Sequence, residues 1–143
     1  MNVALCDDDI IFLENLKNKL SQYNCSIFSF SSAEKLLSSS ICFDIAFLDI
    51  ELDNNISGFQ IVKALRNNNK KCIISFFTNY NKYAIKGYEY QPFRYILKTE
   101  PEKLIRQRID EVFTEYHRNQ KIISGTYNGY SFRTSLSDIY YIS

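Results

Sequence analysis

The segment DIAFLDI, residues 44–50, is a nearly uninterrupted apolar run with an aspartate, Asp49, near its carboxyl end. A short run that is apolar on both faces is typical of a strand in a parallel sheet that helices cover on both sides. The polar stretch that follows it ends in glycine and indicates a loop, and residues 59–66 have apolar side chains at helical spacing. The segment therefore predicts a strand, a loop and a helix, with Asp49 where the strand ends.

Units of this kind recur on both sides of that segment. Four further apolar runs are each followed by residues at helical spacing, and these runs are residues 2–6, 25–30, 72–78 and 93–98. Right-handed crossovers between consecutive parallel strands leave few possible topologies. We therefore expect an α/β fold with a flavodoxin-like, doubly wound parallel sheet of five strands in the order 2-1-3-4-5.

Two pairs of residues have the spacing of helix capping boxes. Ser31 and Glu34 stand before the second helical segment, and Thr99 and Glu102 stand before the last one. Pro101 falls in the first turn of that last helix, where proline is tolerated. The sequence thus predicts Ser31 and Thr99 as the N-caps of these two helices.

Polar side chains follow four of the five predicted strands. They are Asp7 and Asp8 after the first strand, Asp49 at the end of the third, Thr78 at the end of the fourth and Lys98 at the end of the fifth. In the order 2-1-3-4-5 the first and third strands are neighbours, and ligands bind beyond the carboxyl ends of such strands. We therefore expect the three carboxylates to lie together in one crevice.

Three carboxylates in one crevice repel one another and require a cation. All the candidate ligands are oxygen atoms, which favours the hard ion Mg²⁺. Lys98 can pair with Asp49 or with a phosphoryl oxygen, and the Thr78 hydroxyl can donate to the same oxygen. The set indicates an aspartate nucleophile equipped for phosphoryl transfer.

Each of these residues also has a simpler interpretation. Asp8 or Asp9 could be a helix N-cap, Thr78 could be a turn residue, and Lys98 could be a solvated charge at a strand end. The functional interpretation depends on the coincidence that all these side chains fall at the same edge of one predicted sheet.

The sequence resembles the receiver domains of two-component response regulators. The resemblance covers residues 1 to about 118 and rests on four motifs in their proper order, which are VALCDDD, DIAFLDIEL, SFFT and YILK. It implies that Asp7, Asp8, Asp49 and the backbone carbonyl of Glu51 bind Mg²⁺. It also implies that Asp49 is the phosphoacceptor for a sensor histidine kinase, which makes the chain a switch and not an enzyme with turnover.

The same resemblance implies a path for the signal. Thr78 and Lys98 would sense the phosphoryl group, and Tyr95 would change its exposure as Thr78 moves. The face made by the fourth helix, fifth strand and fifth helix would then form a homodimer. Receivers usually carry a proline after the lysine, often in a cis bond, whereas Thr99 follows Lys98 here. We predict a trans bond with the ammonium still within reach of Asp49.

The last part of the chain is assigned to another unit. Residues 119–143 have alternating strand patterns with turn signals at Asn128-Gly129 and Ser137-Asp138. They resemble a linker and the first strands of a LytTR-type DNA-binding domain, and YAIKGYEYQPFRYILK resembles receivers joined to such domains. Such a domain needs about 100 residues, so DNA would be bound only through an output domain that is missing here. A C-terminal hairpin of the receiver itself remains the alternative.

Composition and charge exclude some other classes of function. Lysine and arginine number 17 against 16 acidic residues, and no basic cluster forms a nucleic-acid footprint. No apolar run has membrane-spanning length, and the four cysteines lack metal-site spacing. We therefore expect a cytoplasmic protein with no membrane contact and with buried free thiols.

Two other classes of function remain open. An aspartate-nucleophile phosphohydrolase would share this chemistry, although it would need Glu51 in place of a second aspartate two residues after the nucleophile. A receiver-like module that binds partners without phosphorylation would keep the fold and not the switch. Mg²⁺ and phosphoryl-analogue binding discriminate between these classes.

Overall fold

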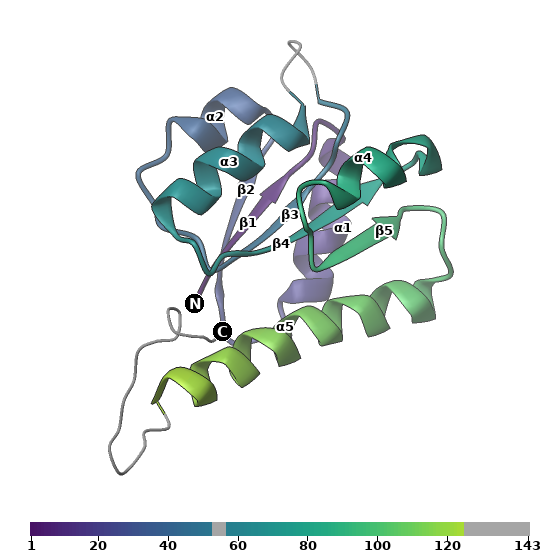
Figure 1. The fold of residues 1–143 in the computed structure, drawn as a ribbon. Helices are drawn as coiled ribbons and strands as arrows, with labels where there is room; N and C mark the ends of the chain where they lie inside the picture. The colour runs from purple at the N-terminus through teal and green to yellow at the C-terminus, as the bar shows by residue number, and fades with distance from the viewer. Residues whose placement is uncertain (53–56, 125–143) are drawn as a thin grey trace.

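The computed structural model describes residues 1–52 and 57–124, with side chains through residue 120 (Figure 1). The elements in chain order are β1 (Asn2–Cys6), α1 (Ile10–Leu20), β2 (Ser26–Phe30), α2 (Ala33–Leu37), β3 (Ile45–Leu48), α3 (Gly58–Asn68), β4 (Ile73–Thr78), the 3₁₀-helix η1 (Asn81–Tyr83), α4 (Ala84–Tyr88), β5 (Arg94–Leu97) and α5 (Glu102–Ser124).

The strands form one parallel sheet in the order β2-β1-β3-β4-β5, which confirms the predicted flavodoxin-like topology. The switch point lies between β1 and β3, where Cys6 pairs with Leu48. Because the two strands end in register, the residues just beyond them, Asp7 and Asp49, emerge side by side at the carboxyl edge of the sheet.

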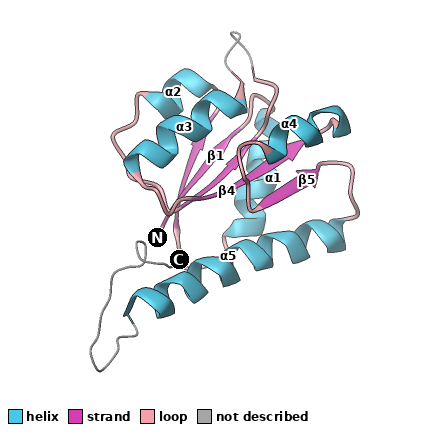
Figure 2. Cartoon of the chain, in the orientation of Figure 1, coloured by secondary structure: helices cyan, strands magenta, loops and turns pink. Residues whose placement is uncertain are grey.

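Helices cover both faces of this sheet (Figure 2). Alternate side chains of β1, such as Ala4 and Cys6, pack in a cluster with α2 and α3, whereas Val3 and Leu5 pack in a second cluster with α1 and α5. Since successive side chains of a strand point to opposite faces, a strand with both faces covered must be apolar throughout. The continuous apolar runs in the sequence have this physical cause.

Two helix starts differ from the prediction. In α2 the N-cap is Ser32 and not Ser31, because Ser32 has the extended backbone of a cap and its hydroxyl accepts the Lys35 N–H at 3.3 Å. The helix α5 begins at Glu102, and the carbonyl of Pro101 accepts the Ile105 N–H at 3.0 Å. Thr99 is therefore not the N-cap.

The late start of α5 has a steric cause. A proline disfavours the helical conformation of the residue before it, which here is Glu100. Glu100 instead closes a turn, with its N–H donating to the Leu97 carbonyl at 3.1 Å. The helix therefore cannot begin before Pro101. The described residues contain no cis peptide bond, so the predicted trans bond between Lys98 and Thr99 is confirmed.

Three further predictions concern the ends and the surface. The predicted domain boundary at residue 118 falls inside α5, and the strand and turn predictions after residue 124 lie outside the described residues. All four cysteines are free, but only Cys6 and Cys72 are buried, whereas Cys25 is half-buried and Cys42 is exposed. Among the described helices, none combines the length and the apolar character that crossing a membrane requires.

Candidate phosphoryl-transfer site

The polar residues predicted from the strand ends do come together. Asp7 and Asp49 are only 2% and 6% exposed, whereas Asp8 is exposed. One carboxylate oxygen from each of the three residues lies within 4.8 Å of the others. The predicted cluster of three carboxylates therefore forms at the carboxyl edge of β1 and β3.

Asp9 has a different role from its two neighbours. Its Oδ1 accepts the backbone N–H groups of Ile11 and Phe12, both at 3.1 Å, which makes it the N-cap of α1. Its own N–H donates to Asp7 Oδ1 at 2.9 Å. Of the two cap candidates in the sequence, Asp9 is the one used. The cap also orients Asp7.

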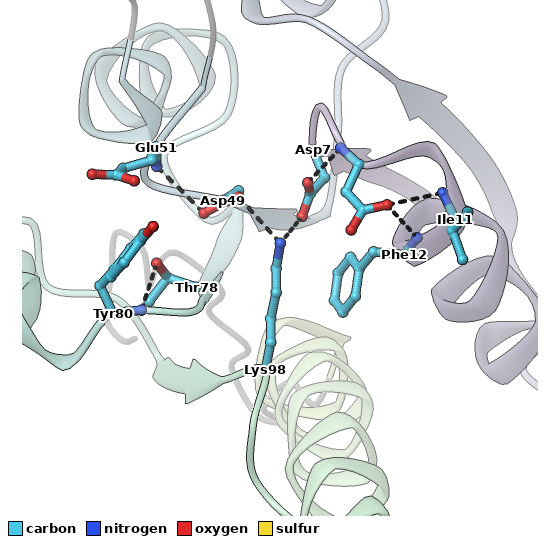
Figure 3. Close-up of polar contacts among 9 residues, drawn as sticks. Asp7, Ile11, Phe12, Asp49, Glu51, Thr78, Tyr80 and Lys98 are labelled. Carbon is cyan, nitrogen blue, oxygen red and sulfur yellow. Dashed lines mark hydrogen bonds and ion pairs between the residues drawn. The ribbon is translucent and has the colours of Figure 1, made fainter.

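Lys98 lies between the two buried carboxylates (Figure 3). Its Nζ is 2.6 Å from Asp7 Oδ2 and 3.2 Å from Asp49 Oδ2, and its side chain is 8% exposed. It therefore lies within reach of Asp49, as we predicted for a trans bond. The backbone holds it there, because the Lys98 N–H donates to the Thr78 carbonyl at 2.8 Å.

Burial and charge compete at this site. Burial raises the pKa of Asp7 and of Asp49, and the nearby Lys98 ammonium offsets part of that increase. For Lys98, burial alone would lower the pKa, but the two carboxylates outweigh it and the pKa is raised. The closeness of the three groups therefore favours their charged forms, against the effect of burial.

The site also fits a hard cation. Asp7 Oδ2 is buried and contacts Lys98 as an ion pair, but no described donor points at it with hydrogen-bond geometry. Because the described residues offer it only that ammonium, this buried oxygen keeps a lone pair for a further ligand. An all-oxygen cluster with such an atom suits Mg²⁺.

Comparison with known proteins identifies the family. Residues 3–110 match the response regulator receiver domain. The chain belongs to this family. It is 30% identical over 120 residues to the sensory transduction protein LytT of Enterococcus faecalis, which covers 80% of this chain and 49% of that protein. It is also 38% identical over 66 residues to the LytT protein of Bacillus cereus, which covers 46% and 26%. The chain thus spans about half the length, or less, of the curated relatives it matches.

Solved structures agree on the fold. The response regulatory domain of mrkE from Klebsiella pneumoniae superposes with a TM-score of 0.72 at 22% identity, covering 82% of this chain and 99% of that one. TrrA from Thermotoga maritima, in a complex with Mg²⁺ and BeF, gives a TM-score of 0.67 at 23% identity, covering 78% and 97%. Likeness at this identity supports the receiver fold alone.

Thr78 lies at the end of β4, where it pairs with Leu97 of β5. It is fully buried, and its hydroxyl accepts the Tyr80 N–H at 3.3 Å. Tyr95 is half-buried and its hydroxyl donates to the Tyr80 carbonyl at 2.7 Å. A single residue, Tyr80, therefore contacts both of the predicted switch residues.

Several residues around the site have no signal in the sequence. The cleft is lined in part by Phe59, Tyr80, Tyr83 and Lys86, none of which follows a predicted strand directly. The Glu51 carboxylate accepts the Tyr83 hydroxyl and lies 3.8 Å from Lys82 Nζ. No local sequence pattern predicts these contacts, because they join segments that are about 30 residues apart.

Gly58 is required where α3 approaches the segment of Asp49 and Ile50. Its N–H donates to the Ile50 carbonyl at 2.9 Å, and a Cβ at this position would lie 2.3 Å from the Asp49 carbonyl oxygen. Real Cβ atoms do not approach backbone that closely, so a side chain here must displace either α3 or Asp49.

We predict that Gly58→Ala lowers the free energy of unfolding by about 1–3 kcal/mol, the usual cost of overpacking. Urea unfolding measures it. Gly87→Ala is the matched control, because its Cβ would meet side chains and not backbone, namely the Tyr95 ring at 3.0 Å and the Phe59 ring at 3.9 Å, and the Tyr95 ring can shift. Equal stability of the two variants would contradict the close approach at Asp49.

Proposed function

We propose that this receiver accepts a phosphoryl group on Asp49 from the phosphohistidine of a sensor kinase, in a reaction that requires Mg²⁺. The observation that supports it best is the position of Asp49. It lies beside two other carboxylates and 3.2 Å from the Lys98 ammonium, at the floor of a cleft of about 660 Å³. A carboxylate held there can attack phosphorus, and the Lys98 ammonium can neutralise charge on the incoming phosphoryl group.

The chemistry assigns a role to each side chain. An Asp49 oxygen attacks phosphorus in line, a new P–O bond forms, and the P–N bond to the kinase imidazole breaks. The imidazole, protonated on its other ring nitrogen, takes the electron pair of the P–N bond and leaves as the neutral base. Lys98 then pairs with a phosphoryl oxygen, and the Thr78 hydroxyl donates to the same oxygen. Bound Mg²⁺, held by Asp7, Asp8, Asp49 and the Glu51 carbonyl, would neutralise the charge on the phosphoryl oxygens.

The metal ligands can be tested by stability. We expect Mg²⁺ to raise the free energy of unfolding by about 1.4 kcal/mol at about ten times its dissociation constant. Asp7→Asn is expected to abolish this increase, because it removes a ligand charge. Thermal unfolding with Mg²⁺ and with EDTA measures the difference.

Asp9→Asn is the matched control for Asp7→Asn. It makes the same change of charge two residues away, and asparagine is as good an N-cap as aspartate. The Asp9 variant should keep the Mg²⁺ response. A response that survives in the Asp7 variant would contradict the proposed ligand set.

The phosphohydrolase alternative receives less support. It would need Glu51 to act as the second acid, but that carboxylate is engaged by Tyr83 and Lys82 and points away from Asp49 in Figure 3. Stoichiometric, labile phosphorylation would support the switch. Turnover of phosphate monoesters would support the hydrolase.

We further propose that the signal leaves through Thr78 and Tyr95 to the face of α4, β5 and α5. On α4 of this face Ile85 and Tyr88 are 83% and 68% exposed, which suits a homodimer contact. Light scattering before and after phosphorylation tests it. An unchanged monomer mass would count against dimerisation.

The likeness to LytT proteins supports an output through a LytTR-type DNA-binding domain outside residues 1–118, with the whole protein acting in the cytoplasm. The described residues carry no such domain, so we expect this chain alone to show no sequence-selective DNA binding. Fluorescence anisotropy with labelled duplexes measures it, and saturable selective binding would contradict this assignment.

A further inference from the structure

Phe12, in the first turn of α1, lies over the ammonium group of Lys98. The distance from Lys98 Nζ to the centre of the ring is 4.3 Å. The same nitrogen has Asp7 on one side at 2.6 Å and Asp49 on another at 3.2 Å. An ammonium attracted to the face of an aromatic ring gains most where water is excluded, and the Lys98 side chain is only 8% exposed.

The ring is itself held in place from two directions. The Phe12 N–H donates to the Asp9 cap at 3.1 Å, which sets where the first turn of α1 places the side chain. The ring packs edge-on against Phe77, with centroids 5.3 Å apart, and Phe77 packs in turn against Phe47 at 5.8 Å. Phe77 and Phe47 lie on β4 and β3, close before Thr78 and Asp49. The ring is therefore anchored to the strands that carry the site.

Lysine has a long, flexible side chain whose ammonium must be confined to act at one place. The two carboxylates confine it on the side of β1 and β3, and Figure 3 shows the Phe12 ring beside the same nitrogen, on the side of α1. A leucine could fill the space of the ring but has no negative face for a cation. The residue type at this position therefore matters beyond packing.

We propose that Phe12 is a positioning residue for phosphoryl transfer, whose ring keeps the Lys98 ammonium between Asp7 and Asp49. There it can reach a phosphoryl oxygen that arrives on Asp49. The proposal rests on the proposed function of this same site. It gives α1 a part in the reaction besides its packing against the sheet.

The first test compares one substitution in two backgrounds. Phe12→Leu is expected to slow phosphorylation by acetyl phosphate and Mg²⁺ by about 3- to 30-fold, which spans the values for exposed and for desolvated cation–π contacts. In a Lys98→Gln background the same change should alter the rate less than about 2-fold. Equal slowing in both backgrounds would overturn the proposal, because the ring would then act through the fold and not through Lys98.

A graded series covers the case in which a background variant folds poorly or is inactive. Mono-, di- and trifluorophenylalanine at position 12 weaken the negative face of the ring stepwise with little change in shape. The phosphorylation rate should fall with each fluorine. A flat series would overturn the proposal.

Nuclear magnetic resonance gives a readout that does not depend on phosphorylation. The ring current of Phe12 should displace the Lys98 side-chain proton signals upfield in the unmodified protein, and Phe12→Leu should remove the displacement. Identical signals in both proteins would overturn the contact. No adduct in the unmodified protein would instead overturn the proposed function, and the displacement would still decide whether the ring holds the ammonium.

Discussion

Asp49→Asn is expected to slow phosphoryl adduct formation at least about 1,000-fold, because it removes the proposed nucleophile. The amide keeps nearly the same shape but has a much weaker nucleophilic oxygen. The variant should fold, because Lys98 still pairs with the buried Asp7 carboxylate when the charge of Asp49 is removed. Intact mass after incubation with acetyl phosphate and Mg²⁺ measures the adduct, which should appear once in the unmodified protein and not in the variant.

Asp44→Asn is the matched control. Asp44 stands at the other end of the same strand, where its carboxylate accepts the Asn2 N–H at 2.8 Å, far from the cleft. This variant should form the adduct at the normal rate. An adduct on Asp49→Asn would move the acceptor to another residue. No adduct on the unmodified, folded protein would favour a receiver-like module that acts only by binding partners.

Lys98→Met is expected to destabilise the metal-free protein at neutral pH by about 3 kcal/mol. It leaves Asp7 and Asp49, which are almost completely buried, without the cation between them, and uncompensated buried charge is among the most costly of single changes. Urea unfolding in EDTA measures the loss. Mg²⁺ should restore part of it by replacing the missing positive charge.

The pH dependence of this loss has a defined sign. Burial raises the folded-state pKa of Asp7 and Asp49 above their ordinary value of 3.8. Ionising these two carboxyls therefore lowers the free energy of unfolding as the pH rises from 3.8 through the folded-state pKa. Without Lys98 those pKa values rise further. The destabilisation should therefore shrink as the pH falls toward 3.8, where both carboxyls become neutral.

Lys98 contributes in the opposite pH range. Its pKa is raised above 10.5 by the two carboxylates, which outweigh its burial, so its contribution to stability is complete below 10.5 and is lost as the pH rises through the folded value. Lys19→Met is the control, because Lys19 pairs with the exposed Glu102 at 3.5 Å and should cost less than about 1 kcal/mol. Similar losses for both lysines would contradict the buried charge cluster.

The strands and their order could be predicted because their cause is local and repeated. Each strand buried on both faces must be apolar throughout, and right-handed crossovers then restrict the sheet order. Helix starts were less certain, since two adjacent serines compete for the cap of α2 and Pro101 delays α5 past Thr99. Such choices depend on backbone angles that a spacing pattern does not contain.

By itself, the sequence determined which chemical groups stand at the carboxyl ends of the strands, and so that Asp7, Asp8, Asp49, Thr78 and Lys98 belong to one edge of the sheet. Only the tertiary structure decided which residues contact this edge and what they do there. In it Asp9 caps α1, the Phe12 ring lies over Lys98, and Gly58 packs against Asp49. The reason is physical: strand periodicity is a short-range property, whereas these contacts join segments that meet only after the helices have packed on the sheet.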